Sequence, residues 1–227
     1  MIFVLGGDGF LGKGITKILK EEGKNYKIIN KLNYKKYINK KCDILINTST
    51  NSYKYLAKKD YFYDFDNTVI NISNSIKNFK FKKYILISSC EVYNDLSNKK
   101  FNSENSNINP ILLTNYGLNK FLGELLVKKS CNKWLILRCN GLVGSHMKKN
   151  PIYDLLNNKK LYINPESKFQ FLNTTYVGKV LNKLINKNII NEVFNVSGKN
   201  SISINKIAEI LKIRKINLKK KSRSVKL

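Results

Sequence analysis

The chain has 227 residues, of which 42% are hydrophobic, and it carries 42 lysines and arginines against 15 acidic residues, a formal net charge of +27. This length suffices for one well-buried domain with a small additional lobe, and no uncharged apolar run is long enough to span a membrane. The charge invites a nucleic-acid hypothesis. The lysines are spread along the whole chain and accompany no helix-turn-helix, zinc or RNA-binding motif, so we favour solvated lysine faces over a specific nucleic-acid surface.

The four cysteines, at positions 42, 90, 131 and 139, show neither paired spacing nor a CxxC motif. The first residues enter an apolar strand pattern without a basic leader. Both features are typical of a reduced, cytoplasmic protein. We expect no metal site, because no cysteine or histidine pattern with metal-ligand spacing is present.

Strand-like and helix-like segments alternate along the chain. The apolar periodicity predicts strands at residues 1–5, 26–30, 42–47, 83–88, 134–137 and 193–196, and helices at 10–22, over much of 60–79, and at 115–129, 176–186 and 204–211. This alternation predicts an α/β protein with a Rossmann-type, doubly wound parallel sheet. We expect the Rossmann domain over residues 1–143. A reduced substrate-binding lobe, integrated with the same domain, is expected over residues 144–227.

The chain ends in a basic tail, in which five cations are candidates to hold a nucleotide diphosphate: Lys219, Lys220, Lys221, Arg223 and Lys226. A solvated chain end explains the same residues, and we favour that interpretation. The two helices and the strand expected after residue 175 are assigned to the small lobe.

A glycine-rich segment, GGDGFLG at residues 6–12, lies between the first predicted strand and the first predicted helix. Such a turn lets the backbone approach a pyrophosphate, whose charge the helix N-terminus favours. The spacing is G-x-x-G-x-x-G and not the commoner G-x-G-x-x-G, and a tight turn without a ligand is the alternative. The residues expected to bind a dinucleotide here are Gly6, Gly9, Phe10, Leu11 and Gly12.

Dinucleotide sites often place an acidic residue after the second strand, where it holds the ribose 2′-hydroxyl. Here Asn30, Lys31 and Asn33 follow that strand, and no carboxylate is present. Lys31 can instead neutralise a 2′-phosphate, which favours NADP(H) while leaving NAD(H) open. An ordinary surface lysine explains the position equally well.

A second group of polar residues follows the fourth predicted strand. YILISSCEVY (84–93) ends that strand in Ser88 and Ser89, and NYGLNKFLGE (115–124) places Tyr116 and Lys120 on one helix face. A nearby ammonium stabilises a phenolate, so the tyrosine can exchange a proton with a sugar oxygen while a nicotinamide exchanges a hydride with the carbon. Tyr-x-x-x-Lys also occurs at 37/41 and 55/59. The order of glycine turn, serine strand and Tyr/Lys helix therefore carries the prediction.

These motifs together resemble the extended short-chain dehydrogenase/reductases, in particular the NAD(P)-dependent epimerase/dehydratase group that acts on nucleotide sugars. The likeness rests on GGDGFLG (6–12), DNTV (66–69), SSCEVY (88–93), YGLNKFLGE (116–124) and LRCNGLVG (137–144), and it continues more weakly to residue 198. It implies that Ser89, Tyr116 and Lys120 are catalytic, and that Lys120 also contacts the nicotinamide ribose. Further residues that it places at the cofactor are Asn47, Thr48, Ser49 and Asn67.

The resemblance also implies substrate contacts at Cys90, Asn140 and Gly141, with Gly141 standing where many relatives carry a substrate-binding asparagine. Dehydratases and decarboxylases of the family often carry an acidic residue at the position of Glu91. Because Cys90 stands where an aspartate would precede it, Glu91 is either an acid–base group or a polar residue at the mouth of the site. The helices near 60–79 and 115–130 are implied to form a homodimer interface.

The implied function is NAD(P)H-dependent reduction of a 4-keto nucleotide sugar, since the short segment between the glycine turn and Asn47 looks like that of the compact 4-ketoreductases. Tyr116 would protonate the keto oxygen, Ser89 would orient it, and Lys120 would tune Tyr116. Two alternatives stay open: a nucleotide-sugar epimerase or dehydratase with tightly bound NAD, and a non-catalytic dinucleotide-binding module. The expected partner is a nucleotide-linked sugar, with no membrane and no specific nucleic acid.

Overall fold

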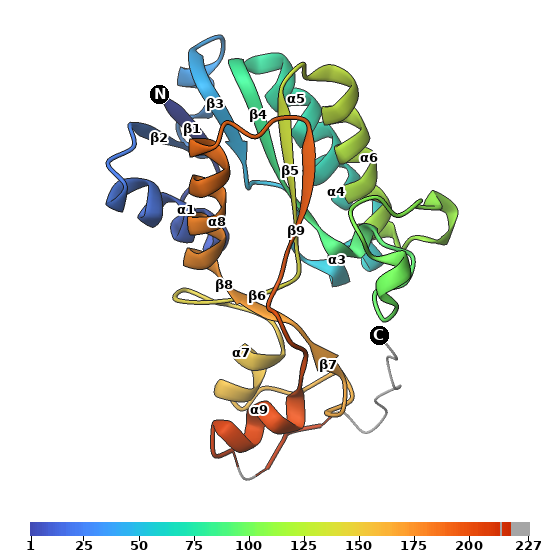
Figure 1. Cartoon of the computed structure of the whole chain (residues 1–227). Helices are drawn as coiled ribbons and strands as arrows, with labels where there is room; N and C mark the ends of the chain where they lie inside the picture. The colour runs from blue at the N-terminus through green and yellow to red at the C-terminus, as the bar shows by residue number, and fades with distance from the viewer. Residues whose placement is uncertain (214, 219–227) are drawn as a thin grey trace.

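The main layer of the molecule is a six-stranded parallel sheet, in a computed structural model that describes residues 1–213 and 215–218 (Figure 1). Its strands, in spatial order, are β2 (Tyr26–Ile29), β1 (Ile2–Leu5), β3 (Lys41–Asn47), β4 (Lys80–Ser89), β5 (Trp134–Cys139) and β9 (Glu192–Val196). The chain leaves β1 for β2 on one side and returns to β3 on the other. Such a reversal marks the ligand crevice at the carboxyl ends of parallel strands. The predicted Rossmann-type fold class is confirmed.

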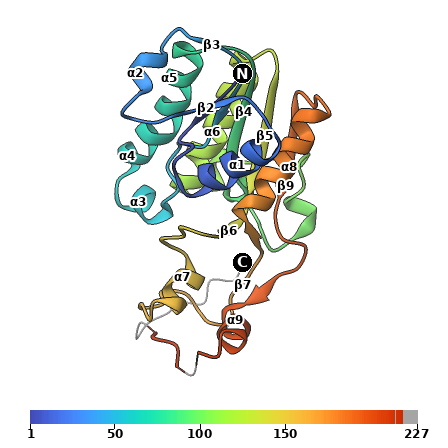
Figure 2. The same cartoon turned by 90° about the vertical axis from the view of Figure 1, so that its left-hand side faces the viewer.

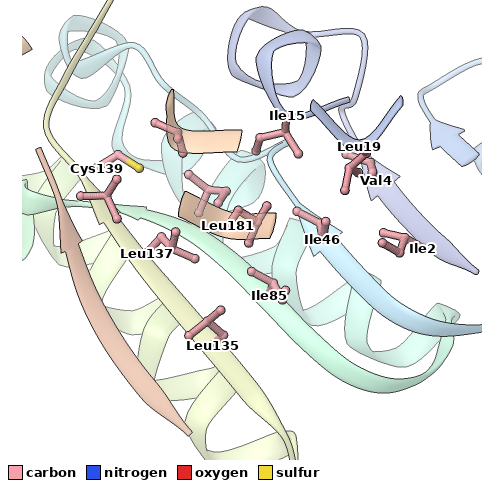
Figure 3. Packing of buried hydrophobic residues seen from close by; sticks show 13 residues of the cluster. Ile2, Val4, Ile15, Leu19, Ile46, Ile85, Leu135, Leu137, Cys139 and Leu181 are labelled. Carbon is pink, nitrogen blue, oxygen red and sulfur yellow. The ribbon is translucent and has the colours of Figure 1, made fainter. Parts of the chain in front are cut away.

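Helices cover both faces of this sheet. One face packs against α1 (Phe10–Glu21) and α8 (Thr174–Asn186), and the other against α5 (Asn71–Asn78) and α6 (Asn115–Ser130) (Figure 1). Successive strand residues alternate between the faces, so Val4 joins the α1 cluster and Leu5 the α5 and α6 cluster. Figure 3 shows the first cluster, in which Ile15, Leu19 and Leu181 pack onto the strands.

Helices α1 and α8 approach closely because each presents a glycine to the other. A Cβ on Gly14 would lie 2.6 Å from Cβ of Thr174, and a Cβ on Gly178 would lie 2.9 Å from the carbonyl oxygen of Gly14. A side chain at either position would push the two helices apart. Gly14, which falls outside the G-x-x-G-x-x-G spacing, is therefore explained by helix packing.

Helix α8 and strand β9 belong to the Rossmann domain, which is the sheet with the helices that cover it. Helix α8 packs on α1, and β9 pairs with β5 along its length. The lobe expected from residue 144 onward therefore does not contain them. Apolar periodicity predicts the type of an element but not its neighbours, which explains the difference. The elements that do form the lobe are β6 (Gly141–Val143), α7 (Pro151–Leu156), β7 (Lys168–Phe169), β8 (Phe171–Asn173), β10 (Ile202–Ser203) and α9 (Ile204–Ile210).

This lobe lies at the carboxyl edge of the sheet, below the strands in Figure 2, and has its own apolar cluster. Its buried members are Leu155, Leu161, Ile204, Ile207 and Ala208. The basic cluster at residues 219–226 lies outside the described residues. Among the helices formed by the described residues, none combines the length and the apolar composition that crossing a membrane requires.

The long helix predicted over residues 60–79 consists of three consecutive segments: α4 (Tyr61–Phe65), a π-helical turn (Asp66–Ile70) and α5. Three short helices were not predicted: α2 (Tyr34–Tyr37), α3 (Lys54–Lys59) and α7. Helices of four to six residues contain too few turns for an apolar period to emerge. Short 3₁₀ turns occur at Cys90–Val92, Lys99–Phe101 and Pro110–Leu112.

Candidate active site

The glycine turn between β1 and α1 leaves no room for side chains. Gly6 has φ = +71°, in the left-handed region, and a Cβ on Gly12 would lie 2.1 Å from the Gly6 carbonyl oxygen. Gly9 is the N-cap of α1, and Phe10 and Leu11 form the first turn of that helix. The turn therefore offers bare backbone beside the positive end of a helix dipole, an arrangement that suits an anion.

The end of β3 supports this turn from the other side. Thr48 Oγ1 donates a hydrogen bond to the Gly6 carbonyl oxygen at 3.0 Å, and a Cβ on Gly6 would lie 3.0 Å from Cα of Ser49. Asn47 is fully buried; its amide donates to the Tyr84 hydroxyl at 2.9 Å, and its Oδ1 accepts from the Ser49 backbone at 2.9 Å. Thr48 and Ser49 thus lie against the glycine turn, while the Asn47 side chain braces the strand end.

Two other residues expected at the cofactor lie further out. Lys31 is exposed after β2, and its neighbour Asn30 donates from Nδ2 to Asp8 Oδ2 in the glycine turn at 3.0 Å. Asn67 lies in the π-helical turn, where its backbone carbonyl accepts from the Asn51 backbone N–H at 3.0 Å. Lys31 therefore stands at the rim of the turn, next to a carboxylate that the sequence analysis did not consider. Asn67 supports the loop that follows β3.

Ser89, Tyr116 and Lys120, from two different elements, come together at the carboxyl end of β4. Lys120 Nζ lies 5.2 Å from the centre of the Tyr116 ring and donates to Thr50 Oγ1 at 2.6 Å. Ser89 ends β4, and its side chain lies near enough to Tyr116 to lower the pKa of the phenol. Helix α6 packs closely on the turn after β4, because a Cβ on Gly117 would lie 2.2 Å from the backbone carbonyl oxygen of Glu91.

The charges around these residues keep Tyr116 protonated. Burial raises the pKa of Tyr116, the carboxylates of Glu91 and Asp64 raise it further, and the nearby Ser89 side chain opposes them. Burial lowers the pKa of Lys120 to about 8, against the attraction of Asp64, which favours the charged ammonium. At neutral pH the pair therefore presents a phenol that can donate a proton and an ammonium beside it.

Asp64, on α4, is a fully buried carboxylate that the sequence analysis missed. Its Oδ1 accepts from Asn51 Nδ2 at 2.6 Å and its Oδ2 from Asn119 Nδ2 at 2.7 Å. Asn119 immediately precedes Lys120 on α6, and Asn51 follows Thr50, whose hydroxyl accepts a hydrogen bond from the Lys120 ammonium. Asp64 therefore ties α4, α6 and the loop after β3 together. Its setting among aromatic residues gave no sequence signal for this role.

A buried ion pair anchors the end of β4 to α6. Arg138 Nη2 of β5 donates to Glu124 Oε2 of α6 at 2.6 Å, and neither side chain is more than 2% exposed. Ser88 Oγ donates to Glu124 Oε1 at 2.6 Å, and Arg138 Nη1 donates to the Tyr93 hydroxyl at 2.8 Å. The pair fixes the strand end that carries Ser89 relative to the helix that carries Tyr116.

The side chains of Glu91 and Cys90 lie in different surroundings. Glu91 forms an ion pair with Lys54, and its side chain is 20% exposed. Cys90 is buried with Val92, its thiol donates to the backbone carbonyl oxygen of Arg138 at 3.4 Å, and burial raises its pKa to about 12. The Cys90 thiol therefore belongs to the core, whereas the Glu91 carboxylate lies near enough to the site to raise the pKa of the tyrosine there.

Asn140 and Gly141 connect β5 to β6. Asn140 Nδ2 donates to Gln170 Oε1 at 3.2 Å, and its Oδ1 accepts from the Gly141 backbone at 2.9 Å. A Cβ on Gly141 would lie 2.8 Å from the Gln170 carbonyl oxygen. Glycine is thus required here by the close approach of β6 to β8.

Lys149, in the loop between β6 and α7, also reaches this region. Its Nζ donates to the backbone carbonyl of Ser52 and, at 3.0 Å, to Ser52 Oγ, and it lies 3.6 Å from the centre of the Tyr53 ring. Burial lowers the pKa of Lys149 to about 7, and the charges of Lys120 and Lys54 contribute to the shift. In so lysine-rich a chain, no sequence signal distinguishes this lysine from the others.

No metal-binding group accompanies these residues. Within residues 1–213 and 215–218, no three His, Cys, Asp or Glu side chains gather in a way that could hold a metal ion.

Comparisons with known proteins identify the family of the chain. The model of the NAD dependent epimerase/dehydratase family matches residues 2–158. The chain is 26% identical to dTDP-D-glucose 4,6-dehydratase from Dictyostelium discoideum over 253 aligned positions, covering 86% of this chain and 57% of that protein. It therefore spans little more than half the length of this curated relative.

Two solved structures share the fold. A mutant of UDP-glucuronic acid 4-epimerase from Bacillus cereus, in complex with UDP-4-deoxy-4-fluoro-glucuronic acid and NAD, superposes with a TM-score of 0.79 at 20% identity, covering 99% of this chain and 86% of that one. dTDP-4-dehydrorhamnose reductase from Bacillus anthracis, in complex with NADP, gives a TM-score of 0.78 at 18% identity, with coverage of 99% and 86%. At these identities the likeness is one of fold.

Proposed function

Since the chain belongs to the NAD-dependent epimerase/dehydratase family of extended short-chain dehydrogenase/reductases, we propose that it is an NAD(P)H-dependent oxidoreductase that reduces a 4-keto nucleotide sugar. The observation that carries the proposal is the meeting of Ser89, Tyr116 and Lys120 at the carboxyl edge of the sheet. A glycine turn suited to an anion lies at the same edge, after β1.

The residues around the glycine turn fit a dinucleotide. Glycine at positions 6 and 12 keeps the turn tight, because a Cβ there would meet Ser49 or the Gly6 carbonyl oxygen, and the start of α1 is thereby left open to a pyrophosphate. A nicotinamide cofactor, when bound, supplies or accepts the hydride. We propose NADP(H), with Lys31 at the 2′-phosphate. NAD(H) is the second candidate, because the Asp8 carboxylate, hydrogen-bonded to the residue before Lys31, would repel a phosphate there.

In the proposed reaction Tyr116 donates its proton to the keto oxygen of the sugar. Ser89, beside Tyr116 at the end of β4, orients the same oxygen. Lys120, held in place through Thr50, stabilises the phenolate that is left on Tyr116. Burial of the site strengthens each of these interactions.

Dehydration is the nearest rival reaction, and it requires an acid and a base beside the sugar. The Cys90 thiol lies in the core with its pKa raised to about 12, so it is not an acid at neutral pH. The candidate for a base at this position is Glu91, which is paired with Lys54. The missing acid favours reduction, whereas the resemblance to a dehydratase keeps elimination as the second candidate.

Cofactor stoichiometry separates these reactions. A screen of the purified chain against 4-keto nucleotide sugars, with NADPH and then NADH, should show one cofactor oxidised for each sugar reduced. Conversion of a nucleotide sugar without net loss of NAD(P)H would identify an epimerase or dehydratase. Absence of cofactor binding in any form would refute the proposal.

We further propose a homodimer formed through the outer faces of α4 to α6. Phe62, Ile70 and Leu125 are 75%, 40% and 44% exposed, so these neighbouring segments present large apolar side chains to solvent. Pairing these faces across a two-fold axis would bury them, as in most homodimers.

A further inference from the structure

Three lysines from three separate segments meet beside Tyr116. Lys54 begins α3, Lys120 lies on α6, and Lys149 lies in the loop between β6 and α7. The charges of Lys54 and Lys120 both act on Lys149 and lower its pKa, so the three ammonium groups lie within electrostatic reach of one another. Lys149 comes from the lobe, whereas Lys54 and Lys120 come from the Rossmann domain, so the cluster spans both parts of the molecule.

The three charges are not equally compensated. Lys54 is paired with the Glu91 carboxylate, and the buried Asp64 attracts the charge of Lys120. Among the ion pairs of the described residues, by contrast, none includes Lys149. A partly buried ammonium with no anionic partner is less favourable than a paired one, and two like charges beside it add to the penalty.

The contacts of Lys149 do not neutralise its charge. Its Nζ donates to a carbonyl and a hydroxyl oxygen of Ser52 and lies over the Tyr53 ring, all of them neutral groups. These residues immediately follow Thr50, the partner of Lys120. The ammonium groups of Lys149 and Lys120 therefore contact the same short loop, residues 50–53, at the carboxyl edge of the sheet.

We propose that Lys149, together with Lys54 and Lys120, forms an oxyanion subsite beside Tyr116 that binds a negatively charged group of the substrate. The proposal rests on the proposed function and narrows its substrate class. The group is a carboxylate on the sugar ring or the diphosphate that links sugar and nucleotide, because an ammonium binds both as a point charge. A wholly neutral substrate group would leave the Lys149 charge uncompensated.

Equilibrium binding to the full chain, without turnover, tests this subsite. Titration calorimetry at fixed ionic strength would use glucuronic acid and glucose, each as its UDP and dTDP ester, and UDP and dTDP alone. The variant is Lys149→Gln. Its matched control is Lys148→Gln, which removes the same charge from the adjacent exposed residue.

We expect Lys149→Gln to weaken binding about tenfold or more, the loss of one charge-assisted hydrogen bond, and Lys148→Gln to change it less than about twofold. A loss confined to the glucuronic acid esters assigns the subsite to a sugar carboxylate. An equal loss for all esters and for free UDP and dTDP assigns it to the diphosphate. Lys149→Arg, which keeps the charge, should retain most of the affinity in either case.

Three results would overturn the subsite: unchanged affinities in Lys149→Gln, equal losses in Lys149→Gln and Lys148→Gln, or no binding of any of these ligands to the unmodified chain. Binding of NADPH and NADH, measured on the same samples, shows that the variants are folded. It also keeps the two proposals apart. If the unmodified chain binds neither cofactor the proposed function fails, whereas intact cofactor binding with an unaffected Lys149→Gln refutes the subsite alone.

Discussion

Lys120 donates a 2.6 Å hydrogen bond to Thr50, so the loop after β3 holds the lysine of α6 beside Tyr116. Thr50→Val keeps the shape of the side chain and removes the acceptor. We expect kcat to fall about tenfold, the effect of one hydrogen bond to a charged group, with little change in KM. Steady-state kinetics checks this, and a fall in thermal stability without a change in kcat would contradict it.

The buried pair of Arg138 and Glu124 makes a prediction about stability. Arg138→Met leaves the buried Glu124 carboxylate without its cationic partner and should destabilise the fold by about 3–5 kcal/mol. The double variant Arg138→Met with Glu124→Leu removes both charges and should recover part of that loss. Urea unfolding measures both, and a double variant less stable than the single one would argue against this explanation.

The packing of α1 on α8 predicts that Gly14 is intolerant of substitution. Gly14→Ala places a methyl group 2.6 Å from Thr174 and should cost about 1–3 kcal/mol, although alanine favours helices. Lys17→Ala, at an exposed position of the same helix, should change the free energy of unfolding by less than about 0.5 kcal/mol. Equal stabilities of the two variants in urea would show that the helices can separate without penalty.

Binding at the proposed oxyanion subsite should weaken as pH rises. The pKa of Lys149 lies at about 7 and that of Lys120 at about 8, each lowered mainly by burial, so both lysines carry their charge below these values and lose it above them. The other groups facing Lys149 are Lys54, paired with Glu91, and the Tyr53 ring.

We therefore expect the affinity for the anionic ligand to fall between about pH 7 and pH 9. The bound anion itself favours the charged lysine, so the decline begins above the pKa of the free protein. Lys149→Gln should show the shallower decline that Lys120 alone produces. Calorimetric titrations across this range test it, and parallel profiles for the two proteins would exclude Lys149 as the titrating group.

The proposed dimer interface is open to a direct test. Phe62→Asp places a charge where the apolar face of α4 would be buried and should shift the protein to monomers. Ile210→Asp, which changes a similarly exposed apolar residue in the lobe, is the control. Sedimentation velocity measures both, and a monomeric unmodified chain would contradict the interface.

Much of the fold could be predicted from the sequence, because its strands are apolar and bounded by turns. The glycine turn, the strand ending in Ser89 and the helix carrying Tyr116 all lie where their patterns put them. The placement of α8 and β9 could not be predicted, since periodicity does not specify which strand is the partner. The short helix α3, which carries Lys54, could not be predicted because its six residues contain too few helical turns to show an apolar period.

The polar residues around the site were harder to foresee. Asp64 and Glu124 are buried carboxylates whose partners lie on other elements, so only the folded chain reveals them. Lys149 resembles every other lysine until the lobe places it beside Lys120. Residues recognised by their local motif were thus accessible from the sequence, whereas those defined by long-range contacts were not.

The central claim is that Tyr116 donates the proton when a 4-keto nucleotide sugar is reduced. The measurement that tests it most directly is the rate of NAD(P)H oxidation with such a sugar, for the unmodified chain, Tyr116→Phe and Tyr55→Phe. Tyr55 begins a second Tyr-x-x-x-Lys pattern but is 65% exposed on α3. We predict that Tyr116→Phe lowers kcat at least about a hundredfold, the usual contribution of a general acid, and that Tyr55→Phe leaves it unchanged. Undiminished turnover in Tyr116→Phe would contradict the mechanism.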